Sequence, residues 1–116
     1  MTLVSAPAHR ALDYTIVVVF ALAPTVLGLT GVPSWLAWGL AVVHLLLTWA
    51  TRFEAGGRGA VPFRVHGWVE LVVGLALAAF PWVTEWPQTA RMFYGVAGGV
   101  ILLIWLLTRY EPLHAA

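Results

Sequence analysis

The sequence predicts an all-α membrane protein, with four transmembrane helices built from two similar helical hairpins. Of its 116 residues, 61% are hydrophobic and only 9% are charged, whereas an ordinary soluble domain carries about 25% charged residues. A soluble chain this short would expose much of its surface to water, and a disordered chain would be poor in apolar residues. Four apolar stretches and an internal repeat complete the prediction.

The four apolar stretches cover residues 11–29, 35–50, 67–83 and 92–107. At about 1.5 Å per residue each would span roughly 24–28 Å, slightly less than a hydrocarbon core of about 30 Å. Because a backbone in lipid must satisfy its own hydrogen bonds, we expect these stretches to be helices.

The links between the stretches differ in length. Residues 30–34 and 84–91 are short and join antiparallel neighbours, whereas residues 51–66 form a longer link with a flexible glycine-rich turn at residues 56–59. Arginines are concentrated on the side of this longer link, with only Arg91 on the other side. The positive-inside rule therefore predicts that both termini and the middle link lie in the cytoplasm. The expected location is a bacterial cytoplasmic (inner) membrane.

Charge and cysteine content exclude several classes of protein. The net charge is +1, so no basic patch suggests a nucleic-acid partner. The chain has no cysteine, which excludes disulfides, iron–sulfur clusters and thiolate metal sites.

An internal repeat appears when the chain is shifted by 57 residues. Residues 9–54 and 66–111 then share ten identities over 46 positions. His9 falls on His66, Asp13 on Glu70, and the segment 51–54 on 108–111. Because each unit contains an even number of spans, both have the same orientation, and an axis along the membrane normal relates them. We expect one transmembrane domain over residues 1–116, a four-helix bundle with pseudo-twofold symmetry.

A family resemblance follows from residues 68–74, which read WVELVVG, and from the Phe80-Pro81-Trp82 triplet after them. This pattern resembles the SPW-repeat family of small membrane proteins, which implies two membrane helices per repeat but no particular activity. The serine position of the family is Phe80 here, and the first repeat keeps only Pro24 of the motif.

Prolines and glycines mark expected features of helix geometry. Pro24 and Pro81 lie late in the first and third spans, where we expect helix kinks, with a hinge or a freed ion-binding carbonyl as the alternative. Gly74, Gly95 and Gly99 are expected to let helices approach closely, either within the bundle or in a homodimer or larger membrane complex.

The carboxylates Asp13 and Glu70 each follow a histidine, His9 or His66, by four residues, which places each pair on one helix face. The preferred interpretation is two symmetry-related ion-pair clusters formed with arginines at the same depth. These arginines are Arg52 and Arg109. The alternative is a polar vestibule that receives protons or a cation. A metal site is only weakly suggested, because the two pairs would have to meet across the pseudo-axis, so none is predicted.

His44 lies near the centre of the second span, where an ionisable side chain is costly and often functional. The preferred interpretation is a neutral imidazole bonded to a carbonyl or a buried water. The alternative is a relay from His44 through Thr48 to Glu70. Haem ligation by two histidines of one chain is disfavoured, and no cofactor is predicted.

No phosphate loop, His-Glu-x-x-His motif or nucleophile elbow is present in the sequence, so an enzyme is not predicted. The leading expectation is a structural or accessory membrane component, with the lipid bilayer and a homodimer or larger complex as partners. The alternatives are a minimal proton or small-solute transporter or channel, and a membrane protein that binds a cofactor or lipid.

Overall fold

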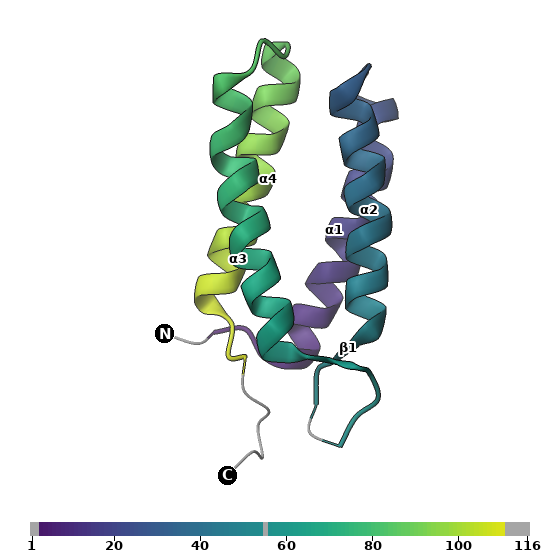
Figure 1. Ribbon diagram of the computed structural model, residues 1–116, viewed down its shortest axis with the longest axis vertical. Coiled ribbons are helices and arrows are strands. Elements are labelled where there is room, and N and C mark those ends of the chain that lie inside the picture. Colours follow the sequence, from purple (N-terminus) through teal and green to yellow (C-terminus); the bar gives the residue numbers. More distant parts are fainter. Residues whose placement is uncertain (1–2, 55, 111–116) are drawn as a thin grey trace.

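The computed structural model describes residues 3–54 and 56–110, and these form two helical hairpins (Figure 1). In each hairpin two antiparallel helices pack along each other. The first hairpin consists of α1 (Ala6–Leu27) and α2 (Val32–Ala50), and the second of α3 (Phe63–Ala79), the short 3-10 helix η1 (Phe80–Val83) and α4 (Gln88–Leu107).

All four hairpin arms are long and apolar enough to cross a membrane. They contain 22, 19, 21 and 20 residues, counting α3 and η1 together, and their mean hydropathy is between 1.4 and 1.8. Eighteen residues of helix already extend about 27 Å. The predicted fold class, an all-α membrane protein made of two hairpins, is therefore confirmed.

The helices begin earlier than the apolar stretches do. Ser5 caps α1, and its hydroxyl accepts a hydrogen bond from the backbone N–H of Ala8 at 3.3 Å. His9 and Asp13 therefore lie well inside the helix. The predicted starts were late because apolar composition marks the hydrocarbon region, whereas a cap sets where a helix begins.

Two parallel backbone pairings tie the repeats together at the end of the molecule that carries both termini. The strands β1 (Thr51–Arg52) and β2 (Val61–Pro62) pair with Thr51 opposite Val61, and an isolated bridge joins Val4 to Thr108. These pairings are equivalent under the 57-residue shift. The segment before α1 thus lies beside the end of α4, and the segment before α3 beside the end of α2. For the middle link the sequence had predicted only a flexible turn.

The hairpins lie close together at this end and further apart at the other (Figure 1). Side chains connect them further along the bundle. The Tyr94 hydroxyl donates a 2.5 Å hydrogen bond to the carbonyl oxygen of Pro33, and the rings of Phe20 and Phe93 meet edge to face with centroids 5.5 Å apart. The buried residues of this apolar core are Phe20, Ala37, Ala41, Leu77, Tyr94 and Ile101.

Glycines set the spacing of α3 and α4, but the closest approach is not at Gly95 and Gly99, the two glycines of α4 expected to pack. A Cβ at Gly98 would collide with the backbone of Ala78 and would lie 2.8 Å from the carbonyl oxygen of Gly74. Gly95 packs against the Trp82 side chain, whereas a Cβ at Gly99 would meet nothing within 4 Å. The expected packing role of Gly99 within the bundle is therefore wrong, because one residue along a helix turns the side-chain direction by about 100°.

The prolines lie where the helices change. Pro24 is in the last part of α1, and its carbonyl oxygen accepts the N–H of Leu29 at 2.9 Å. Pro81 lies in η1, which continues α3 after Ala79. Proline has no N–H to continue the α-helical ladder, which accounts for the change to a 3-10 turn.

Candidate cation-binding centre

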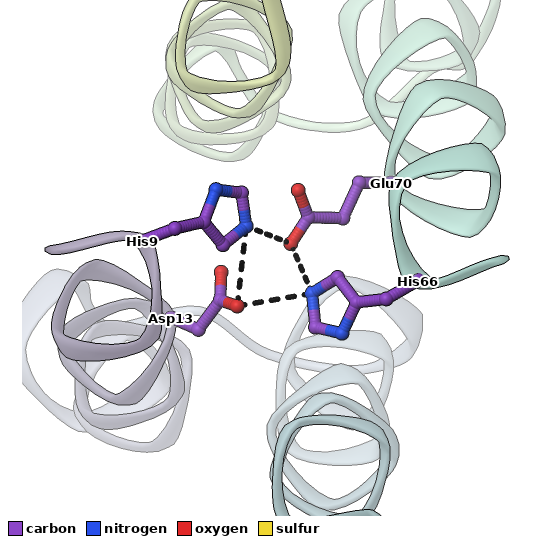
Figure 2. Close-up of side chains that lie close together, drawn as sticks. All are labelled: His9, Asp13, His66 and Glu70. Carbon is purple, nitrogen blue, oxygen red and sulfur yellow. Dashed lines mark hydrogen bonds and ion pairs between the residues drawn. The ribbon is translucent and has the colours of Figure 1, made fainter. Parts of the chain in front are cut away.

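Two histidines and two carboxylates meet between the hairpins at the end that carries the termini (Figure 2). His9 and Asp13 come from α1, and His66 and Glu70 from α3. None of the four is more than 3% exposed. The prediction of two separate clusters is therefore wrong, because the pseudo-symmetric packing brings both pairs to one place.

The four side chains form a closed ring of alternating nitrogen and oxygen atoms (Figure 2). The Nε2 atom of His9 lies 3.2 Å from Asp13 Oδ2 and 3.0 Å from Glu70 Oε1. The Nε2 atom of His66 lies 2.9 Å and 2.6 Å from the same two oxygens. The four residues each offer one ligand atom, and these atoms all lie within 4.8 Å of one another.

The expected ion pairs with Arg52 and Arg109 are not found among the described residues, and both arginines are exposed. The reason is local. The chain is extended where α2 and α4 end, so successive side chains point to opposite sides. Thr51 and Thr108 are buried toward the centre, and each arginine that follows faces outward.

Each threonine holds the histidine of the other repeat. Thr108 Oγ1 lies 2.8 Å from His9 Nδ1, and Thr51 Oγ1 lies 2.7 Å from His66 Nδ1. Both hydroxyls also donate 2.5 Å hydrogen bonds to carbonyl oxygens, that of Thr108 to Ile104 and that of Thr51 to Leu47. A hydroxyl has one hydrogen, so each must accept from the imidazole. Nδ1 therefore carries a proton, and Nε2 faces the carboxylates.

Sequence reasoning missed these two threonines as site residues. Their signal was present, because Thr51 and Thr108 coincide under the 57-residue shift. Only the exchange of partners between the repeats reveals their role.

Different side chains approach the outer oxygens of the two carboxylates. The Tyr110 hydroxyl donates to Glu70 Oε2 at 3.1 Å. Burial raises the pKa of Tyr110 above its ordinary value, and the charge of Glu70 adds to this effect, so the phenol stays protonated. His44 Nε2 lies 3.3 Å from Asp13 Oδ1. The repeat counterparts of Tyr110 and His44 are Phe53 and Ile101, so this outer layer breaks the pseudo-symmetry.

The suggested relay from His44 through Thr48 to Glu70 needs correction. His44 approaches Asp13, because α2 packs against α1. Thr48 is buried, and its hydroxyl makes no hydrogen bond within the described chain.

Asp13 is surrounded by imidazoles but accepts no hydrogen bond from any described residue. Three histidine nitrogens lie at ion-pair distances of up to 3.3 Å from its oxygens, but neither oxygen has a hydrogen-bond partner among the described residues. Glu70 differs, because its Oε1 lies at hydrogen-bonding distance and angle from the Nε2 atoms of His9 and His66, at 3.0 and 2.6 Å, and its Oε2 accepts from Tyr110. The two buried carboxylates thus differ in their hydrogen-bonding geometry.

Aromatic rings cover the histidines. The Phe63 ring meets His9 edge to face at a centroid distance of 5.2 Å, and the Phe53 ring meets His66 at 5.5 Å. Beside this layer lies a cavity of about 350 Å³, lined by residues of α1, α2 and the link after α2. Thr48 and Thr51 line the cavity, and Thr51 also contacts His66. The cavity therefore reaches the edge of the centre.

A second cavity has a different character. An apolar groove of about 830 Å³ runs along α1 and α4, from Leu12 and Ile104 to Leu27 and Gln88. No ionisable side chain lines it. Its surface suits hydrocarbon chains and not acid–base or ion chemistry.

Comparison of the chain with protein-family models, with curated proteins and with solved structures finds no match. The resemblance to the SPW-repeat family stays a prediction. The functional argument therefore depends on the centre itself.

Proposed function

We propose that this is an integral membrane protein whose buried centre holds two units of positive charge, as two protons or one divalent cation, between its two hairpins. The observation that carries this is the pair of carboxylates, Asp13 and Glu70, which are 1% and 3% exposed and face histidines instead of arginines. Burying two anions without compensation costs several kcal/mol for each ion. A compensating charge must therefore enter the centre.

The surroundings support binding from one face more than conduction across the membrane. The cavity of about 350 Å³ reaches the edge of the centre at Thr51, which contacts His66, at the end with the termini. On the side of the centre that faces away from the termini lies the apolar core, which includes Phe20, Leu77 and Ile101. A polar approach at that end suits uptake and release on that side.

The arginine distribution supports a cytoplasmic approach to the centre. Arg10, Arg52, Arg58 and Arg109 belong to the end with the termini, and Arg91 to the first turn of α4 at the other end. We infer a bacterial cytoplasmic membrane protein with both termini inside the cell.

A structural or accessory role is the second candidate function. The centre joins α1 to α3, and the backbone pairing of Val4 with Thr108 joins the two ends of the chain at the same level. In this role the centre would keep its two protons permanently. It would hold the two hairpins together and would neither take up nor release cations.

The test is the charge state of the histidines in the full chain, stripped of metal by a chelator and embedded in lipid nanodiscs. Nitrogen-15 NMR of labelled histidine separates imidazolium from neutral imidazole. We expect His9 and His66 to be imidazolium at neutral pH, and to become neutral when Asp13→Asn and Glu70→Gln are combined. Two neutral imidazoles in the metal-free native chain would contradict the proposal.

A further inference from the structure

Building on the proposed cation-binding function, we infer that the two positive charges are supplied by one divalent first-row transition-metal ion. Its ligands are His9 Nε2, His66 Nε2, Asp13 Oδ2 and Glu70 Oε1. The inference stands on four independent features: the histidine tautomers, the state of Asp13, the dimensions of the ring, and the donor types.

The histidines are oriented as metal ligands are in proteins. A ligating imidazole commonly donates its second N–H to a neighbouring acceptor, which fixes its tautomer and its ring orientation. Here Thr108 and Thr51 accept from the Nδ1 atoms of His9 and His66 at 2.8 and 2.7 Å. The Nε2 lone pairs of the neutral rings are thereby directed at the centre.

Asp13 distinguishes a metal ion from two protons. With a proton on each Nε2, both N–H groups point at Glu70 Oε1, and neither serves Asp13. Asp13, which is 1% exposed, would then have the two imidazolium charges at 2.9 and 3.2 Å but no hydrogen bond to its oxygens within the described chain, and an unmade hydrogen bond at a buried charged group is costly. A cation inside the ring contacts Asp13 Oδ2 and the three other atoms together.

The ring has the dimensions of a small metal site. Its four nitrogen–oxygen edges measure 2.6 to 3.2 Å. With metal–ligand bonds of about 2.0–2.1 Å, adjacent ligands lie about 2.9 Å apart in a square arrangement and about 3.3 Å apart in a tetrahedral one. The four edges are thus close to the spacing of a square arrangement, whereas a tetrahedral one requires all of them to widen.

The donor set selects the class of ion. Two imidazoles with two carboxylates suit Zn²⁺, Co²⁺, Ni²⁺ or Cu²⁺, whereas Mg²⁺ and Ca²⁺ prefer oxygen ligands throughout. A dication with Asp13 and Glu70 is also electrically neutral as a unit, which suits a site buried between membrane helices.

His44 and Tyr110 act as positioning residues for this site. Each lies beside the carboxylate oxygen that faces away from the ion, His44 at Asp13 Oδ1 and Tyr110 at Glu70 Oε2. Such outer contacts orient ligands and typically change metal affinity about 10–100-fold when removed.

The experiment is a titration of the tag-free, chelator-stripped full chain in nanodiscs with Co²⁺, followed by competition with Zn²⁺. We expect one Co²⁺ per chain, with visible d–d absorption that Zn²⁺ abolishes and that millimolar Mg²⁺ and Ca²⁺ leave unchanged. Asp13→Asn and His66→Gln should each weaken binding at least 100-fold. Glu85→Gln, which removes an exposed carboxylate in the link before α4 at the other end of the molecule, is the matched control and should bind as the native chain does.

The native titration needs no variant, so a substitution that prevents folding cannot hide the answer. No stoichiometric Co²⁺ binding by the native chain, with His9 and His66 found as imidazolium, overturns the metal site and leaves the proton-held centre in place. No binding together with neutral imidazoles overturns both. Binding that survives His66→Gln in a variant with native helicity would place the ion elsewhere and also overturn the assignment.

Discussion

Two threonine hydroxyls decide which nitrogen of each central histidine faces the carboxylates. The hydroxyls of Thr51 and Thr108 each donate their single hydrogen to a carbonyl oxygen one helical turn earlier. Each hydroxyl oxygen therefore accepts a hydrogen bond from a histidine, His66 or His9 respectively. Two threonines thus fix the orientation of both imidazole rings, although in each case the threonine and the histidine belong to different helical repeats.

Thr108→Val tests this role at the residue level. The substitution keeps the shape of the side chain but leaves the Nδ1–H of His9 without its partner in a buried site. We expect a loss of stability of about 1–3 kcal/mol, measured as reversible unfolding in detergent. Thr15→Val is the control, because its exposed hydroxyl also bonds a carbonyl oxygen one turn back, that of Ala11, but holds no histidine. Equal effects of both variants would argue against a special role for Thr108.

Tyr110→Phe makes the second repeat resemble the first, where Phe53 stands at the equivalent position. The ring and its contact with Phe63 at 4.8 Å are retained, and the hydrogen bond to Glu70 Oε2 is lost. We expect Co²⁺ affinity to fall about tenfold with an unchanged stoichiometry. An unchanged affinity would mean that the phenol does not position Glu70.

At the scale of whole elements, α3 and α4 approach closely because one glycine of α4 faces the α3 backbone. Gly98→Ala would place a methyl group against Ala78 and Gly74, whose backbone has no room to move aside cheaply. We expect a destabilisation of about 1–3 kcal/mol from this overpacking, measured as the thermal unfolding midpoint in nanodiscs.

The neighbouring glycine provides a matched control. A Cβ at Gly99 would meet nothing within 4 Å in the described structure, so Gly99→Ala should be neutral or slightly stabilising through its higher helix propensity. A large loss of stability from Gly99→Ala would indicate instead that this face is occupied by another chain in the membrane.

At the scale of the whole molecule, two hairpins that each pack internally are joined most closely at one end (Figure 1). The chain contains no cysteine, so spin labels attached to introduced cysteines will modify only the chosen positions. Val26 and Val83 lie at the far ends of the two hairpins and are 74% and 80% exposed. Labelled cysteines at these two positions therefore report the separation of the hairpins.

We expect the distance distribution between these labels, measured by pulsed electron resonance, to broaden when Asp13→Asn and Glu70→Gln are combined. The neutral side chains no longer hold positive charge between α1 and α3, so the hairpins can swing about the end where the chain segments pair. The same labels with Glu54→Gln serve as the control. An equally narrow distribution in the double variant would show that the apolar core alone sets the separation.

The sequence predicted the four spans, the two hairpins and the candidate residues His9, Asp13, His66 and Glu70. It could do so because these predictions depend on local properties of the sequence, namely apolar composition, proline position and a four-residue spacing. Such properties do not depend on how the helices pack against one another. The helix starts were displaced because Ser5 and the polar residues after it lie outside the hydrocarbon pattern but inside the helix.

Only the tertiary structure decided that the two pairs form one centre. Spacing places His9 and Asp13 on a common face but does not say which face of α1 meets α3. The backbone pairings of Val4 with Thr108 and of Thr51 with Val61 set that register, turn the threonines inward and turn Arg52 and Arg109 outward. The physical reason is that local sequence determines which side chains share an element, whereas their partners depend on contacts between segments far apart in the chain.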